Sequence, residues 1–223
     1  MTKRKENTSK GKEIIAHKLV RELYQEGHVF DTFRFEVNCD MGSLSFDKMV
    51  NLGKDSTGNE YSVGLVGNDL VMFTNASKVR SRLVLDCGEG EYSLDILGVP
   101  MDFDSFEVCD IDLIKFKCVD LSNCVIDKEQ FKGCYMYDAE RVIFAEYDGA
   151  LGDKFVYVPA KEFDFGENKF KNVGYVGNLF RLCNNLKRLS ISSEGWKNLS
   201  LADGFNEFQS DMLEKGVSID IKG

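Results

Sequence analysis

Aspartate recurs at one place in the repeated strands of this 223-residue chain, between two apolar residues of a short β-strand pattern. Side chains of a strand alternate between its two faces, so a residue between two inward apolar residues points outward. Strands disfavour aspartate, so its repeated use there calls for a reason. The position holds Asp95, Asp120, Ile143, Asp164, Ser190 and Asp220. We call the four aspartates the aspartate column and treat it as a candidate binding surface.

The chemistry of such a column allows three interpretations. Like charges on neighbouring strands repel one another, and no partner within the column is evident. The carboxylates could bind a partner protein with a basic surface, could hold a cation between Asp95 and Asp120, or could serve only to keep the face solvated. All three remain open at the level of sequence.

A second row of residues precedes the aspartate column by two positions. It holds Ser93, Cys118, Arg141, Glu162, Arg188 and Ser218. Neighbouring strands lie about 4.8 Å apart. Arg141, Glu162 and Arg188 are therefore predicted to form an alternating ladder of ion pairs. We expect a structural role for the ladder, with about 0.2–1 kcal/mol per cross-strand pair.

A strand-and-loop unit that recurs along the chain positions both rows. Residues 116–126, FKCVDLSNCVI, fill every position of the pattern L-x-x-L-x-L-x-x-N/C-x-L. Residues 160–170 follow it with Ala160 at the first position, and residues 186–191 follow its strand part. The apolar pairs begin at positions 94, 119, 142, 163, 189 and 219, so the steps are 25, 23, 21, 26 and 30 residues. This spacing is typical of leucine-rich repeats.

Residues 180–191, FRLCNNLKRLSI, carry the most specific resemblance, since Phe180, Cys183, Leu186, Leu189 and Ile191 follow one another without a gap. The segment resembles the irregular leucine-rich repeats of bacterial BspA-like proteins, and the resemblance covers about residues 90–223. It implies an α/β leucine-rich-repeat-like solenoid with a parallel sheet, in which stacked repeats close one core. It also implies a recognition surface rather than a particular reaction.

The chain is expected to have three parts: a basic flexible tail over 1–12, an N-terminal α/β cap or atypical first repeats over 13–80, and the solenoid over 81–223. Residues 13–27 show helical periodicity, which predicts a helix that caps the core. Phe30, Phe33, Phe35 and Asn38 again fit the repeat pattern. A hairpin or insertion is expected near residues 83–94, and a helix and a last strand near the C-terminus.

The hexapeptide VGLVGN at 63–68 recurs as VGYVGN at 173–178. Glycines in such a segment could cradle a phosphate, but neither copy is followed by G-K-[ST] or forms G-x-G-x-x-G. We therefore interpret the two copies as an internal repeat whose glycines allow tight turns.

Catalysis, cofactors and metals are not expected. The only histidines, His17 and His28, lie near the N-terminus, away from the repeats and from any cysteine pair. No nucleophile elbow, P-loop or H-E-x-x-H motif occurs. Carboxylates are abundant, so an acid pair of the glycosidase type is not excluded by residue type alone. The seven cysteines lack C-x-x-C spacing and are expected to be reduced, buried thiols of a cytoplasmic protein.

Charge sets the choice of partner. The formal net charge is −9, although residues 1–12 are basic. An acidic body repels nucleic acid and attracts basic surfaces. The leading hypothesis is a non-enzymatic intracellular module that binds a macromolecular partner, with a basic surface, through the sheet. The alternatives are a phage-type acidic inhibitor that blocks a nucleic-acid-binding defence or nuclease complex, and RNA binding through the basic N-terminal tail. No membrane span is expected, and the sequence does not indicate an oligomeric state.

Overall fold

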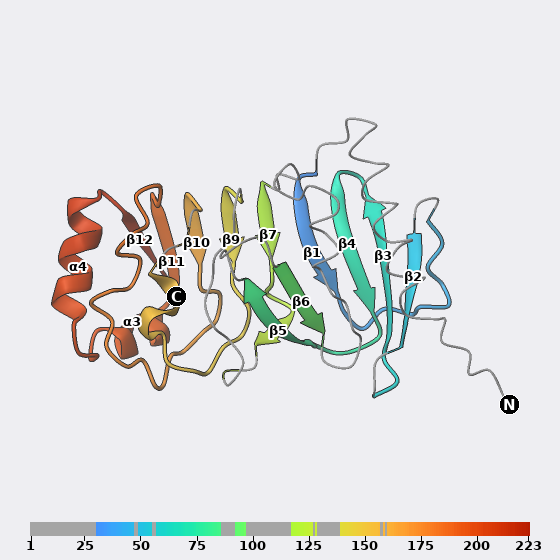
Figure 1. The fold of residues 1–223 in the computed structure, drawn as a ribbon, viewed down its shortest axis with the longest axis horizontal. Helices are drawn as coiled ribbons and strands as arrows, with labels where there is room; N and C mark the ends of the chain where they lie inside the picture. The colour runs from blue at the N-terminus through green and yellow to red at the C-terminus, as the bar shows by residue number, and fades with distance from the viewer. Residues whose placement is uncertain are drawn as a thin grey trace, which may run out of the picture.

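A computed structural model describes residues 30–46, 49–54, 57–85, 92–96, 117–126, 128, 139–156, 158 and 160–223. Within these ranges the fold is α/β, with a mostly parallel sheet and two α-helices (Figure 1). The strands are β1 (Thr32–Glu36), β2 (Met49–Lys54), β3 (Glu60–Val66), β4 (Asp69–Thr74), β5 (Val79–Leu85), β6 (Tyr92–Ile96), β7 (Cys118–Asp120), β8 (Cys124–Ile126), β9 (Arg141–Ile143), β10 (Glu162–Asp164), β11 (Arg188–Ser192) and β12 (Ser218–Lys222). The helices are α3 (Ser193–Leu199) and α4 (Phe205–Glu214), with a 3-10 turn η2 (Gly152–Phe155).

A nine-stranded sheet runs through the molecule in the order β12-β11-β10-β9-β7-β1-β4-β3-β2. Every pair from β12 to β4 is parallel, and the last two pairs are antiparallel. Parallel neighbours need a crossover between strands. In the described residues, β9 to β10 and β10 to β11 are joined by segments without an α-helix, and β11 to β12 by a segment that holds α3 and α4. A separate three-stranded sheet has the order β6-β5-β8.

The register of the parallel strands follows the predicted repeat. Val119, Val142, Phe163, Leu189 and Ile219 are partners in one row across β7, β9, β10, β11 and β12. The first four are buried, and Ile219 on the outermost strand is half-buried. The first residue of each apolar pair therefore lines up from residue 119 onward, as predicted. Sequence spacing fixes register here because a slip by one residue would turn every apolar side chain to the other face.

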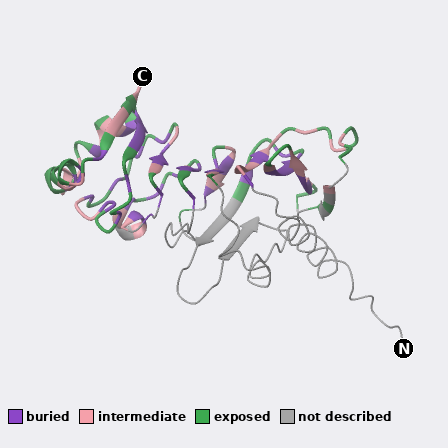
Figure 2. Cartoon of the chain, turned by 90° about the horizontal axis from the view of Figure 1, so that it is seen from above, coloured by how far each residue is buried: buried purple, intermediate pink, exposed green. Residues whose placement is uncertain are grey.

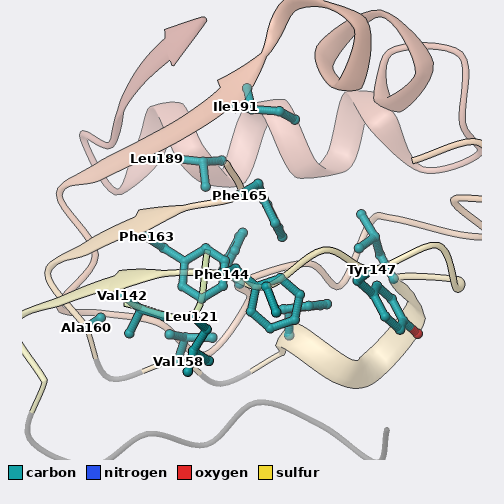
Figure 3. Packing of buried hydrophobic residues seen from close by; sticks show 14 of the residues in the cluster. Leu121, Val142, Phe144, Tyr147, Val158, Ala160, Phe163, Phe165, Leu189 and Ile191 are labelled. Atoms are coloured by element: carbon teal, nitrogen blue, oxygen red, sulfur yellow. The ribbon is translucent and has the colours of Figure 1, made fainter. Parts of the chain in front are cut away.

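Phenylalanine fills much of the core behind this row (Figure 3). The rings of Phe163 and Phe165 contact each other edge to face, with centroids 4.9 Å apart. Phe165 also meets Phe170 at 4.8 Å, and Phe155 meets Phe144 at 5.1 Å. Phenylalanines of the apolar pairs and phenylalanines of the loops that follow them thus share one aromatic core. Aromatic pairs at these separations add to the stability that comes from burial itself.

A buried asparagine connects one loop to the preceding one. Asn168 holds the N/C position of the repeat pattern, and its Nδ2 donates to Ala145 O at 2.8 Å and to Phe165 O at 2.6 Å. Its Oδ1 accepts from Tyr147 N at 2.7 Å. At the equivalent position of the earlier repeat the buried Cys124 occupies this place. Both residues hold the N/C position of the repeat pattern. The bonds of Asn168 give a reason for an asparagine there, because buried loops need partners for their backbone groups.

The two helices and the loops that join β9 to β10 and β10 to β11 lie on one side of the nine-stranded sheet, as the view in Figure 2 shows. Helix α3 begins after Ser192, whose Oγ accepts from Gly195 N at 3.1 Å and donates to Asn168 O at 2.8 Å. A Cβ on Gly195 would lie 2.4 Å from Asn168 O, so this close approach requires glycine. Helix α4 buries Phe208 and Met212. The predicted C-terminal helix and last strand are both present.

The region before residue 80 adds antiparallel strands to the parallel sheet. β1 pairs in parallel with β7, and Phe33 is the partner of Val119, so it extends the predicted row. β2, β3 and β4 form an antiparallel meander. The predicted N-terminal helix over 13–27 and the tail over 1–12 lie outside the described residues.

The two glycine hexapeptides do not have the same structure, so their interpretation as an internal repeat is wrong. Residues 63–68 lie in β3 and in the turn to β4, where Gly67 has a φ of +60°. Residues 173–178 lie in a loop before a series of turns, and there Gly174 has a φ of +69°. Both segments use a glycine for a left-handed turn, but one connects antiparallel strands and the other does not.

Asp95 does not belong to the same sheet as the other members of the aspartate column. It lies in β6, which pairs antiparallel with β5 through Leu83 and Leu94, and β5 pairs with β8. The hairpin expected near residues 83–94 is therefore confirmed. The prediction that the apolar pair at positions 94 and 96 belongs to the repeated strands is wrong, because its alternation comes from a hairpin with the same period.

Candidate functional site

The predicted binding residues from position 118 onward lie on the side of the sheet that faces away from the core. We call this surface, on β7, β9, β10, β11 and β12, the sheet face. Two rows of residues are in register across it. One row is Cys118, Arg141, Glu162, Arg188 and Ser218, and the other is Asp120, Ile143, Asp164, Ser190 and Asp220. The structure therefore brings together all predicted site residues except Asp95.

The predicted ladder of ion pairs is present in part. Arg141 Nε lies 3.9 Å from Glu162 Oε2 on the next strand. Arg188 instead donates from Nη2 to Asp220 Oδ2 at 2.7 Å, across to β12. This hydrogen bond and the nearby carboxylate raise the pKa of the Arg188 guanidinium. At β11 and β12 the ion pair is therefore diagonal: Arg188 of the first row pairs with Asp220 of the second row and not with its register partner Ser218.

Asp164 is the centre of charge pairing on the sheet face. Only 4% of the residue is exposed, although the strand pattern predicts an outward, solvated side chain. Its Oδ2 accepts from Lys222 Nζ at 2.6 Å and lies 3.7 Å from Arg141 Nη2. The expectation that the column has no partners is therefore wrong for this residue. A lysine from two strands away and an arginine from the adjacent strand cover it.

The strand-ending position explains why aspartate occurs there at all. Asp164 Oδ1 accepts from Gly166 N at 2.8 Å, and Asp120 Oδ1 accepts from Ser122 N at 2.9 Å. Each aspartate is the last residue of a three-residue strand and pairs with the backbone two residues on, which is an Asx turn. Aspartate suits this place because it favours turns even though it disfavours strand interiors.

Sequence reasoning missed two contributors to the sheet face. Lys222 lies two residues after Asp220 on β12, so period-two alternation could have placed it on the same face. Arg34 on β1 is the register partner of Asp120, donates from Nε to Asp69 at 3.2 Å and pairs with Glu36. Its signal was the same alternation in β1. Basic and acidic side chains therefore alternate along the sheet, and the face is not uniformly acidic.

The cysteines that the structure describes are poorly suited to nucleophilic chemistry. Cys39, Cys118, Cys124 and Cys183 are free thiols. Burial raises the pKa of Cys183 to about 11 and raises the pKa values of Cys39, Cys118 and Cys124 as well. Because the thiolate is the reactive form, these side chains stay mostly protonated and react slowly at neutral pH. Cys118 and Cys39 are half-buried rather than fully buried as expected.

Metal binding and membrane insertion find no support in the part of the chain that the structure describes. There, no three side chains of histidine, cysteine, aspartate or glutamate come together in a group able to hold a metal ion. No helix in the same ranges is long and apolar enough to cross a bilayer. The hypothesis of a cation between Asp95 and Asp120 assumed neighbouring strands of one sheet, whereas the two residues lie in different sheets.

Comparison with known proteins identifies no relative. No family model, curated protein or solved structure matches the chain.

Proposed function

We propose that this chain is a leucine-rich-repeat-like solenoid that acts as a non-enzymatic, intracellular protein-recognition module. The aligned rows of β7 to β12, the shared aromatic core and the loop-bridging Asn168 support the solenoid assignment. Stacked units that contact their neighbours are the basis of such folds. The four cysteines that the structure describes are free thiols, which agrees with a reducing compartment.

The observation that carries the proposal is that the charged side chains of the sheet face are held in place. These side chains are held by cross-strand ion pairs and Asx turns, while the helices pack on the other side of the sheet. A surface with fixed side chains loses little conformational entropy on binding. The proposed partner is a protein that presents a basic surface, because Asp120, Glu162 and Asp220 remain partly exposed and the chain carries a net charge of −9.

The experiment begins with capture of partners from the native host on the immobilised protein, followed by identification by mass spectrometry. Association of the purified partner is then measured at several salt concentrations. The Asp120→Asn/Glu162→Gln variant should slow association by about threefold to tenfold at low salt, because electrostatic steering acts mainly on the on-rate. Asp164 is left unchanged, since it is buried and pairs with Lys222.

The matched control is Glu207→Gln/Glu214→Gln, which removes the same charge from exposed positions on α4. This control should change association much less. Equal slowing by both double variants would mean that net charge alone matters and would contradict binding through the sheet face. Capture of a nucleic-acid-processing complex would instead favour the inhibitor hypothesis. Capture of RNA would favour RNA binding through the basic N-terminal tail.

A further inference from the structure

The outer edge of the sheet at β12 has backbone groups that no described strand pairs. β12 ends the strand order, and no other described strand lies beside its outer edge (Figure 1). Ser218 N donates to Lys187 O, toward β11. Backbone groups of successive residues point to opposite sides of a strand, so those of Asp220 and Lys222 also point to β11. The N–H and C=O groups of Ile219 and Ile221 therefore point out of the sheet, where they can template another strand.

We propose that β12 pairs antiparallel with β12 of a second copy of this chain, around a two-fold axis at Ile221. In this register the two Ile221 residues exchange both backbone hydrogen bonds, because their N–H and C=O groups both point outward. Ile219 then lies opposite Gly223 of the second copy, which has the same outward orientation. A strand can pair with itself in this way only if its side chains are self-complementary, since a two-fold interface uses one surface twice.

The side chains of β12 meet this requirement. The sequence Asp220-Ile221-Lys222 read in the opposite direction is Lys-Ile-Asp. Each Asp220 therefore lies opposite Lys222 of the second copy, twice per dimer. These are non-hydrogen-bonded pairs, in which Cα atoms approach to about 4.5 Å and the side chains are closest. Opposite charges at such a pair stabilise the pairing, whereas like charges oppose it.

The apolar side chains at this end of the molecule also lack cover. Ile221 is 46% exposed on the core side of the edge strand, and Leu213 of α4, at the same end of the molecule, is 81% exposed. In the proposed dimer the two Ile221 side chains lie opposite each other. Many edge strands are protected by a lysine that keeps other strands away. Here the Lys222 ammonium instead pairs with Asp164 at 2.6 Å, and Asp220 of the second copy would extend this pair across the axis.

A charge exchange between two variants tests the register. The Asp220→Lys variant has lysine at both positions 220 and 222, and the Lys222→Asp variant has aspartate at both positions. Each variant alone should dimerise at least about tenfold more weakly than wild type, because both cross-strand pairs become like-charged. An equimolar mixture should regain dimers, because every pair across the axis is again opposite in charge. Sedimentation over the micromolar range measures both, and thermal melting verifies that each variant is folded.

A backbone variant tests the same pairing without changing charge. Ile221→Pro removes an N–H that points away from β11, and proline is tolerated on edge strands at such positions. It should abolish dimerisation and leave the fold intact, whereas the control Ile221→Val keeps the N–H and should dimerise like wild type. A wild-type protein that stays monomeric, a dimer that persists in Ile221→Pro, or a mixture of the charge variants that fails to associate would overturn the proposal.

Discussion

Replacement of Phe165 by alanine is expected to lower the free energy of unfolding by about 3–5 kcal/mol, the range found for large-to-small changes at buried phenylalanines. Phe165 is 0% exposed, and its ring lies within 4.8–6.3 Å of five others, measured between centroids. The rings around it come from two successive strand-and-loop units of the chain, so the cavity cannot close by moving one loop. Denaturation by urea, followed by far-UV circular dichroism, measures the loss.

The control for this prediction is Phe46→Ala. It deletes the same atoms from a side chain that is 40% exposed and stacks on Phe73 near the other end of the sheet. Its cost should be clearly smaller than that of Phe165→Ala. A Phe165→Ala protein that unfolds at the wild-type urea concentration would show that the aromatic core described above is not present in solution.

Replacement of Leu189 by alanine is expected to cost about 2–5 kcal/mol, as for other fully buried leucines. Leu189 is the β11 member of the aligned apolar row and pairs in register with Phe163 and Ile219. Leu121→Ala, next to β7, should cost a similar amount, because Leu121 is also buried. Both residues belong to the repeat pattern, so both changes test its phase.

The same variants test whether the repeats unfold together. The single tryptophan, Trp196, lies in α3 beside Phe205, far along the sheet from Leu121. If neighbouring repeats are coupled, Leu121→Ala should shift the transition seen by Trp196 fluorescence as much as the transition seen by circular dichroism. A fluorescence transition that stays at its wild-type position would mean that the two ends of the parallel sheet unfold independently.

The apolar row could be predicted from sequence because burial imposes a strict period. Val119, Val142, Phe163 and Leu189 each begin an apolar pair whose two residues must face one core, and the register followed directly. Residue 94 misled the prediction because a hairpin strand such as β6 has the same alternation. The decisive information, which strand lies next to it, is not local in sequence.

The positions of the charged residues on the sheet face could be predicted, but their burial and their ion-pair partners could not. The register of Asp120 and Asp164 was correct, whereas the burial of Asp164 depends on Lys222, which is 58 residues away in the chain. Period-two alternation places a side chain on a face but does not reveal which long side chains reach across to it. The turn bonds of the same aspartates had a local signal, since Ser122 and Gly166 follow them by two residues.

The central claim is that a partner covers the sheet face, and protection of Cys118 from alkylation tests it most directly. Cys118 is a half-buried free thiol on this face, in register with Arg141, whereas the half-buried Cys39 follows β1 in a loop. Their peptides are quantified by mass spectrometry after a thiol reagent is applied to the protein with and without its partner. We predict that the partner slows alkylation of Cys118 severalfold and leaves Cys39 unchanged. Unchanged alkylation of Cys118 in the saturated complex would contradict binding at the sheet face.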